Sequence, residues 1–363
     1  MSEHDLPEEP DRHPGAPHPR HVDALVGQQH ALTEFDQAEA SGRLHHAWLI
    51  TGPRGIGKAT LAWTLARRLL KGDSTASDTN ETLRQIANLS SPDLILCRRP
   101  WDEKRKRLKT AITVDEIREI KSYFQMSSAR DNWRVAIIDC ADEMTGSSAN
   151  ALLKILEEPP ARSVFFLVSH RPSMLLPTIR SRCRELRGRP LGRDALAQVL
   201  GSCDVTIDPD EANALEILSA GSAGAALDLA SGDGIQIYGQ LIQLLLNGPP
   251  LDRQVVRRIC DACATPANSE RFRITIDLLE LLLGRIARAA AGMNLATVSD
   301  TEAQLFARFA GAPGTACTWA ELGPKIRARS DQARLVNLDP AQVMHDTFAQ
   351  IGAAVADMSQ PVA

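Results

Sequence analysis

The chain has 363 residues, a formal net charge of -4 at pH 7 and seven cysteines. Its length predicts about two or three domains, and its mild acidity excludes bulk attraction to nucleic acid as the main mode of action. The cysteines are odd in number and scattered among apolar neighbours, which is typical of reduced thiols. There is no apolar run of about 18 residues and no apolar leader, so we expect a cytoplasmic protein that does not enter a membrane.

The first 20 residues are rich in proline and histidine and lack periodicity, which predicts a disordered tail over 1–20. A turn at Gly27 follows. After it we expect an amphipathic helix with Leu32 and Phe35 on its apolar face.

An apolar run and a glycine-rich turn occupy residues 49–60 (LITGPRGIGKAT), and an amphipathic run (LAWTLARRLL) follows them. This order predicts a strand, a loop and a helix in the phosphate-binding pattern G-x-x-x-x-G-K-[ST]. The loop residues of the pattern are Gly52, Gly55, Gly57 and Lys58. The glycines let backbone N–H groups turn towards a phosphate, the helix N-terminus favours an anion, and the lysine adds a positive charge.

The last position departs from the pattern, because Ala59 replaces the serine or threonine. Alanine cannot ligate the Mg²⁺ ion that normally neutralises charge on a transferred phosphoryl group. Thr60 comes next, but it points about 100° further round the helix and is a poor substitute. The sequence therefore predicts a phosphate site in which hydrolysis is impaired.

The segment between the loop and the central strands is polar at first and then basic. Residues 71–80 predict a surface connection. Residues 98–109 (RRPWDEKRKRLK, Arg98–Lys109) are the most basic segment, and they favour a solvated loop or hairpin over contact with a phosphate backbone or an acidic partner. Thr113 and Glu116 have capping-box spacing and predict a helix that runs to about Phe124.

Apolar strands alternate with amphipathic helices in the first half of the chain. The expected strands cover 93–97, 134–139 and 164–169, and the expected helices cover 82–88 and 148–158. This alternation predicts a parallel, doubly wound α/β sheet with a ligand at the carboxyl ends of its strands. From about residue 190 the strand patterns stop, and short helices at 193–200, 211–220 and 224–231 precede longer ones such as 272–290.

Four segments together resemble the AAA+ clamp-loader family of bacterial replication. They are the phosphate loop, residues 137–160 (IIDCADEMTGSSANALLKILEEPP), Ser181–Cys183 (SRC) and residues 221–227 (GSAGAAL). The resemblance is strong over about residues 21–235 and rests on size and position beyond them. It implies a P-loop AAA+ α/β domain at 21–189, a small helical lid domain at 190–234 and an all-α C-terminal collar domain at 235–363.

Several positions differ from those of the family's motor subunits. Asp139 stands where the motors hold Mg²⁺, but Cys140 replaces the glutamate that polarises water. Gly224 replaces a lid arginine that contacts the γ-phosphate, and Ser169 replaces a threonine or asparagine sensor. The change at Ser169 is the weakest of these, whereas Ala59, Cys140 and Gly224 each remove a separate part of the hydrolysis machinery. The resemblance therefore implies a subunit of the DNA polymerase III clamp loader that does not hydrolyse ATP.

The SRC motif is intact, and the resemblance gives Arg182 the role of an arginine finger that completes the neighbouring subunit's ATP site. An arginine supplied in trans is worth about 10³–10⁵ in rate. The implied protein is a scaffold in a hetero-pentamer with motor (gamma/tau-type) and delta-type subunits. Through the complex it would help load the sliding clamp onto primed DNA, as part of a DNA-directed DNA polymerase, a nucleotidyltransferase.

Bound groups are predicted only in part. Whether ATP or ADP is held without hydrolysis stays open, because loop amides bind an anion without Mg²⁺. Many relatives have a four-cysteine zinc module after the first helix, but residues 71–92 contain no cysteine, so no structural zinc is expected. The CDAC motif at Cys260 and Cys263 lies in a helical pattern without a second ligand pair, and we assign it no metal or redox role.

Two other functions compete with the scaffold. An active clamp-loader-type ATPase would hold Mg²⁺ through Thr60 and Asp139 and position water with another carboxylate such as Asp142. A stand-alone DNA-binding module would use Arg98–Lys109, and the overall acidity of the chain counts against it.

Overall fold

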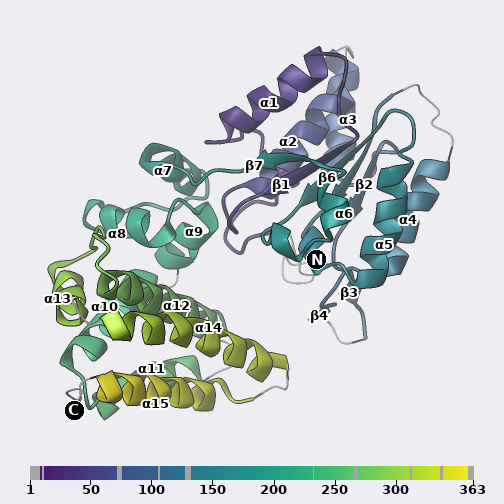
Figure 1. Ribbon diagram of the computed structural model, residues 1–363. Helices are drawn as coiled ribbons and strands as arrows, with labels where there is room; N and C mark the ends of the chain where they lie inside the picture. The colour runs from purple at the N-terminus through teal and green to yellow at the C-terminus, as the bar shows by residue number, and fades with distance from the viewer. Residues whose placement is uncertain are drawn as a thin grey trace. The chain divides into compact units, whose positions relative to one another are not determined.

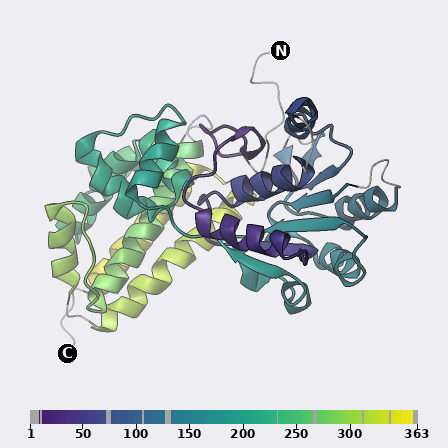
Figure 2. The same ribbon diagram turned by 90° about the horizontal axis from the view of Figure 1, so that it is seen from above.

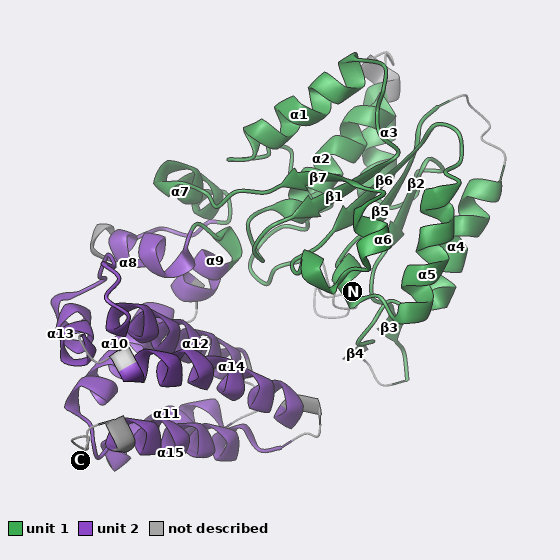
Figure 3. Cartoon of the chain, in the orientation of Figure 1, with its two compact units in different colours: residues 1–203, 221–224 green, residues 204–220, 225–363 purple. Residues whose placement is uncertain are grey.

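The computed structural model describes residues 9, 12–71, 76–104, 107–126, 132–231, 233–264, 269–310, 313–335 and 338–358. The chain divides into two compact units (Figure 3). The first unit comprises residues 1–203 and 221–224, and the second comprises residues 204–220 and 225–363. The predicted boundary between a lid at 190–234 and a collar at 235–363 stays a prediction.

The first unit is built on a five-stranded sheet in the order β2-β5-β6-β1-β7, in which every neighbouring pair is parallel. Its strands are β1 (Ala47–Thr51), β2 (Leu94–Cys97), β5 (Arg134–Ile138), β6 (Ser163–Val168) and β7 (Arg184–Arg187). The predicted parallel α/β fold is therefore confirmed. β7 was not predicted, because in its sequence RELR only Leu186 is buried.

Helices cover both faces of this sheet (Figures 1 and 2). Alternate strand residues point to opposite faces, so one face carries Trp48 and Ile50 and the other carries Ala47 and Leu49. The first face packs against α1 (Gln29–Ala40) and α2 (Lys58–Lys71), and the second against α4 (Val114–Gln125) and α5 (Gly146–Glu157). Two hydrophobic cores thus hold the strands in place.

Local signals place most of these helices correctly. The predicted capping box is present, since Glu116 Oε2 accepts from both the backbone N–H of Thr113, at 2.7 Å, and its hydroxyl, at 2.6 Å. The predicted surface connection at 71–80 is wrong in its second half, because α3 (Ala76–Ala87) begins there. A mostly polar stretch still forms a helix when one side chain such as Ile86 anchors it in the core.

The described end of the predicted tail is packed rather than disordered. The short helix η2 (Pro19–His21) follows His18, which is buried with its ring edge-on to Trp63 at 6.0 Å. Arg67 of α2 donates to the carbonyl oxygen of Arg20 at 2.9 Å. Composition could not predict these contacts, because they join single residues to a distant helix.

Shorter elements complete the first unit. They are β3 (Trp101–Asp102), β4 (Arg107–Leu108), η3 (Ala141–Glu143), η4 (Pro172–Met174), α6 (Pro177–Arg180) and α7 (Arg193–Gly201). β3 and β4 pair antiparallel, so the basic segment forms the hairpin that was one of its predicted forms. Residues 105–106, between the two strands in the sequence, lie outside the described part of the chain.

The described residues of the second unit form helices and connecting loops, with no strand among them. Its helices are α8 (Pro209–Ser219), α9 (Ala223–Ser231), whose first two residues are assigned to the first unit, α10 (Gly234–Asn247), α11 (Arg253–Cys263), α12 (Ser269–Ala290), α13 (Asp300–Phe309), α14 (Pro313–Leu335) and α15 (Pro340–Met358). One apolar core joins them, with Trp319 edge-on to Phe309 at 5.1 Å. Among the described helices of the whole chain, none is both long and apolar enough to cross a membrane.

A buried ion pair lies inside this helical core. Arg285 on α12 places Nε and Nη2 each 2.9 Å from the two carboxylate oxygens of Glu302 on α13. Tyr238 on α10 donates to the same carboxylate at 2.5 Å, and the backbone N–H of Val298 donates to it at 2.8 Å. Both oxygens of the carboxylate are therefore hydrogen-bonded.

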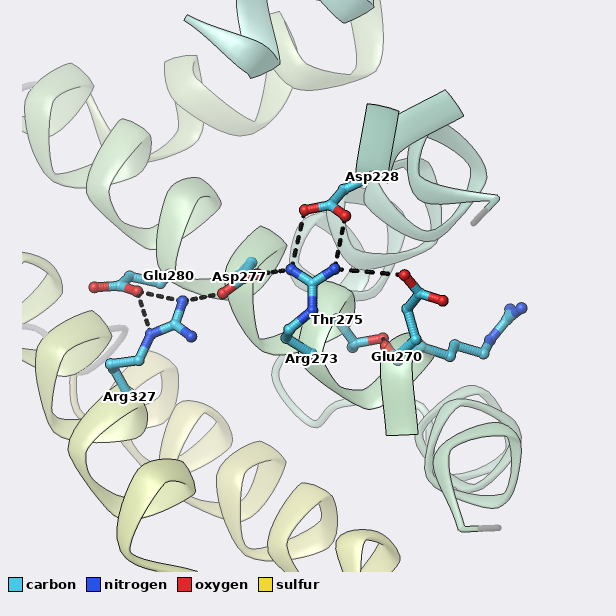
Figure 4. Close-up of polar contacts among 8 residues, drawn as sticks. Asp228, Glu270, Arg273, Thr275, Asp277, Glu280 and Arg327 are labelled. Carbon is cyan, nitrogen blue, oxygen red and sulfur yellow. Dashed lines mark hydrogen bonds and ion pairs between the residues drawn. The ribbon is translucent and has the colours of Figure 1, made fainter. Parts of the chain in front are cut away.

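A second polar network is half exposed and ties three helices together (Figure 4). Arg273 on α12 makes a bidentate contact with Asp228 on α9, at 2.7 and 3.0 Å, and also contacts Asp277 at 3.2 Å. Arg327 on α14 bonds Asp277 and lies 2.8 Å from Glu280. Alternating charges along this chain of contacts join α9, α12 and α14.

Candidate phosphate-loop site

The predicted strand, loop and helix are present at the phosphate loop. β1 ends at Thr51 and α2 begins at Lys58, so residues 52–57 form the loop. The backbone φ angles are 138° at Gly52, 76° at Gly55 and 91° at Gly57. These values favour glycine, and they explain why the chain has glycine at these three positions.

Lys58 is the charged centre of the loop. Its side chain is 4% exposed, and Nζ donates to the carbonyl oxygen of Pro53 at 2.6 Å. Burial lowers the pKa of Lys58 from 10.5 to about 8, although Asp139 and Asp142 act in the opposite direction. A desolvated ammonium with one carbonyl partner fits an anionic ligand, because an anion would restore the stabilisation that burial removes.

The end of β5 carries the second part of the site. Asp139 is 5% exposed and follows the strand directly. Cys140 has a left-handed backbone with φ of 53°, and its Sγ lies 3.4 Å from Nε2 of His170 and 3.7 Å from the Asp139 carboxylate. Burial raises the pKa of the Cys140 thiol, and the nearby carboxylates raise it further. The thiol therefore stays protonated and cannot act as a base towards water at neutral pH.

His170 was not predicted to be a site residue. The one signal for it in the sequence is its position directly after Ser169. Burial, followed by the positive charge of Lys58, lowers its pKa to about 4. The imidazole is therefore neutral at pH 7. Within the described residues, its buried Nδ1 has no hydrogen-bond partner, and neither has the buried Oγ of Ser169. Orphaned polar atoms beside the phosphate loop are expected where a ligand or water completes the bonding.

Asp142 is held by its neighbours. One of its carboxylate oxygens accepts from the backbone N–H of His170 at 3.0 Å, and the other lies 3.8 Å from Nε of Arg171. The carboxylate is almost fully buried. Both oxygens therefore have partners, which leaves this group poorly suited to position an attacking water.

The segment 221–224 packs directly on the loop within the same unit. The backbone N–H of Gly224 donates to Gly55 at 3.1 Å, and the Ser222 hydroxyl donates to Arg54 at 2.9 Å. A Cβ added at Gly224 would lie 3.1 Å from both the Gly55 Cα and the His13 ring. An arginine side chain at this position would therefore require its neighbours to move.

The magnesium position has no hydroxyl, since Ala59 is the second residue of α2. Thr60 is half-buried on the same helix, and its carbonyl oxygen accepts from the Thr64 hydroxyl at 2.8 Å. Within the described residues, no cluster of three or more His, Cys, Asp or Glu side chains could hold a metal ion. The loop thus offers charge and amides for an anion but little for Mg²⁺.

Arg182 lies away from the loop, in the turn after α6. Its Nη2 is 2.9 Å from a carboxylate oxygen of Glu157, and its Nη1 donates to the carbonyl of Thr178 at 3.0 Å. Nearby Arg184 pairs with Glu34 at 3.1 Å. Glu157 was not singled out in the sequence, because a glutamate at the end of a helix gives no signal of a partner 25 residues later.

The other predicted features sit elsewhere. Two arginines of the basic segment are paired within the chain, Arg98 with Glu9 at 3.0 Å and Arg99 with Glu143 at 2.8 Å. Cys260 and Cys263 are fully buried on α11. Burial raises the pKa of both thiols, which suits core packing.

Comparison with known proteins finds similarity to subunits of DNA polymerase III. Residues 27–191 match the family model described as DNA polymerase III, delta subunit. The chain is 34% identical to DNA polymerase III subunit delta′ of Escherichia coli over 224 residues, which are 60% of this chain and 65% of that protein. It is 31% identical to subunit tau of Salmonella typhimurium over 315 residues, which are 77% of this chain and 47% of that protein.

The chain thus spans less than two thirds of the length of either relative. Among solved structures it aligns with a gamma subunit-related protein from Thermotoga maritima over 91% of this chain and 100% of that one. The identity there is 18% and the TM-score is 0.39, values at which the likeness carries no argument about function.

Proposed function

We propose that this chain is a delta′-type subunit of a clamp loader. Its residues 27–191 match the family model described as DNA polymerase III, delta subunit, and the chain is similar to delta′ and tau subunits. In this role it does not hydrolyse ATP. It presents Arg182 to the ATP site of a neighbouring gamma/tau-type subunit, and it belongs to a hetero-pentamer that also contains a delta-type subunit. The complex places a sliding clamp on primed DNA.

The surroundings of Cys140 carry the first part of this proposal. A motor subunit needs a carboxylate there to polarise water, and this chain has a thiol that burial keeps protonated, beside a neutral imidazole. The protonated thiol cannot take up a proton, and one oxygen of Asp142 already accepts from the backbone N–H of His170 while the other lies 3.8 Å from Arg171. The absence of a hydroxyl at Ala59 removes a magnesium ligand from the same site.

The position of Arg182 supports the second part. The residue is about one third exposed on a turn between α6 and β7, where it is accessible to another subunit. A guanidinium is always charged and has a planar set of donors that matches phosphate oxygens. A chain that lacks a catalytic carboxylate yet carries this exposed arginine fits a subunit that contributes to its neighbour's reaction.

We infer that the loop itself binds nucleotide without turning it over. Lys58, the amides of the glycine loop and the α2 N-terminus would hold the phosphates of ATP or ADP. The lowered pKa of Lys58 and the orphaned Oγ of Ser169 support an anionic occupant. Gly224 leaves that occupant without the lid arginine that a motor would use.

One experiment on the full chain tests whether the loop binds nucleotide and whether the chain hydrolyses it. ATP binding is measured by calorimetry with and without Mg²⁺, and phosphate release is measured in the same preparation. We expect binding that depends weakly on Mg²⁺, no phosphate release, and loss of binding in Lys58→Ala. Phosphate release that Lys58→Ala abolishes would contradict the proposal and favour the active ATPase with Thr60 and Asp139 as magnesium ligands.

A further inference from the structure

The guanidinium of Arg182 is held within its own unit by two groups from different elements. Glu157, the last residue of α5, contributes a carboxylate oxygen at 2.9 Å, and Thr178 on α6 contributes a carbonyl oxygen at 3.0 Å. α5 and α6 pack against each other, so the end of α5 is kept beside the turn that carries Arg182. The two contacts fix the direction of a side chain that would otherwise sample many rotamers.

We propose that Glu157 is a positioning residue that keeps Arg182 in an ion pair within its own chain until the polyphosphate of a neighbouring subunit's nucleotide binds the guanidinium. This inference rests on the proposed function. Before that nucleotide binds, Arg182 is paired with the carboxylate of Glu157. When the neighbour's phosphates arrive, they replace Glu157 as the anion that the guanidinium contacts.

The exposure of the pair decides how easily the guanidinium is released. The side chains of Arg182 and Glu157 are 36% and 43% exposed, so water and salt weaken their attraction. A polyphosphate carries several negative charges, and its oxygens accept from a guanidinium in bidentate fashion. A phosphate chain therefore outcompetes one exposed carboxylate, and the pair delays binding without preventing it.

The neighbouring Arg184 forms a similarly exposed ion pair but has an additional contact with an aromatic ring. Arg184 places Nε and Nη2 3.3 and 3.1 Å from one carboxylate oxygen of Glu34, and its guanidinium lies 5.0 Å above the Trp48 ring. Two nitrogens and a ring face hold Arg184. Arg182 has one carboxylate and one carbonyl, which suits a side chain that must leave its partner.

The chain contains a matched control for Glu157. Glu158 is the next residue, is also exposed, and is the C-cap of α5 through its backbone N–H to Lys154 at 3.4 Å. Changing either glutamate to glutamine removes one negative charge from the end of the same helix and preserves side-chain size. Any effect of net charge on the region is therefore common to both variants.

The first test measures how fast phenylglyoxal modifies each arginine in the isolated full chain, resolved by peptide mass spectrometry. We expect Glu157→Gln to raise the modification rate of Arg182 about 2- to 5-fold, the range expected for an exposed ion pair. Arg184 should react at an unchanged rate, and Glu158→Gln should leave Arg182 as in the parent chain. An unchanged Arg182 rate in Glu157→Gln, or an equal rise in Glu158→Gln, would overturn the proposal.

The second test uses the chain in complex with a motor subunit and measures ATP hydrolysis. We expect Glu157→Gln to lower KM for ATP about 2- to 5-fold and to leave kcat within about twofold, because release of the guanidinium precedes the chemical step. An unchanged KM, or a fall in kcat, would overturn the positioning role. If Arg182→Ala leaves the motor's ATPase unchanged, the proposed function fails, whereas the modification result in the isolated chain stands independently.

Discussion

At the phosphate loop of the first unit, buried polar side chains include atoms that no described protein group satisfies, whereas the polar side chains around Glu302 in the second unit bond one another. Ser169 and His170 each leave one buried atom without a partner. The carboxylate of Glu302, by contrast, accepts from Arg285, Tyr238 and a backbone N–H. Both groups of residues are removed from water, so burial alone does not explain the difference.

The contrast is consistent with our proposal that the first group of residues binds a ligand, whereas the second stabilises the fold. A buried ion pair with every oxygen bonded maintains one arrangement of helices, and nothing in it waits for a further partner. A buried ammonium with a lowered pKa beside orphaned polar atoms is costly to the fold on its own. Such a cost is expected where binding of an anion repays it.

We expect the largest change in stability in the second unit. Removing Glu302 from its hydrogen-bonded cluster with Arg285 and Tyr238 leaves a buried charge without its partner. Glu302→Ala strands the guanidinium of Arg285 in the core, and we expect a loss of about 3–5 kcal/mol in the free energy of unfolding. The free energy of unfolding is measured by urea denaturation, with hydrogen exchange of the α12 amides as the readout. A loss below about 1 kcal/mol would show that the pair is solvated, and it would contradict the difference drawn between the two buried sites.

A smaller effect follows from His170. Its pKa of about 4 in the folded chain lies below the unfolded value of 6.5, so the unfolded chain binds more protons between these two values. Stability therefore falls as the pH drops from about 6.5 to 4, by about 1–2 kcal/mol after allowance for solvent screening. His170→Gln should flatten that part of the pH profile of unfolding, and an unaltered profile would contradict the buried neutral imidazole.

Lys58 gives a pH dependence to anion binding. With a pKa of about 8 in the folded chain, the ammonium loses its proton between pH 7 and 9, and an anion binds the protonated form. Affinity for tripolyphosphate should therefore fall about tenfold from pH 7 to pH 9. Calorimetric titrations of the parent chain and of Lys58→Arg, which keeps its charge, provide the comparison. Equal slopes in the two chains would assign the pH dependence to another group.

The smallest change in stability is expected for the Ser169 hydroxyl, which we compare directly with the Tyr238 hydroxyl of the second unit. Ser169→Ala removes a hydroxyl without a partner, and we expect the free energy of unfolding to change by less than about 0.5 kcal/mol. Tyr238→Phe removes a hydroxyl that donates to a buried carboxylate, and it should cost about 1.5–3 kcal/mol. Parallel urea denaturation curves of the two variants test the pair. Equal losses would mean that both hydroxyls are structural.

Signals that lie within a few residues were enough to predict the core of the first unit. The spacing of three glycines and Lys58, and the apolar run before Asp139, depend on local geometry, and both are where the sequence placed them. Contacts between distant residues were not predictable. The packing of His18 on Trp63 depends on the complete fold and leaves no periodic trace in the sequence.

The same reason explains what was missed in the candidate site. His170 approaches Cys140 only because β5 and β6 are neighbours in the sheet, and a single sequence does not give that pairing. The strand β7 was missed because three of its four residues are charged and exposed. Its partner β1 determines its conformation more than its own composition does.

The most direct measurement reconstitutes this chain with a gamma/tau-type motor subunit and compares ATP hydrolysis with Arg182→Ala and with Arg180→Ala. Arg180 is an exposed arginine two residues earlier, at the end of α6, and serves as the control. We expect Arg182→Ala to lower the motor's kcat by about 10³-fold or more and Arg180→Ala to leave it within about twofold. Equal rates in the two variants, or ATP hydrolysis by the isolated chain, would contradict the proposed function.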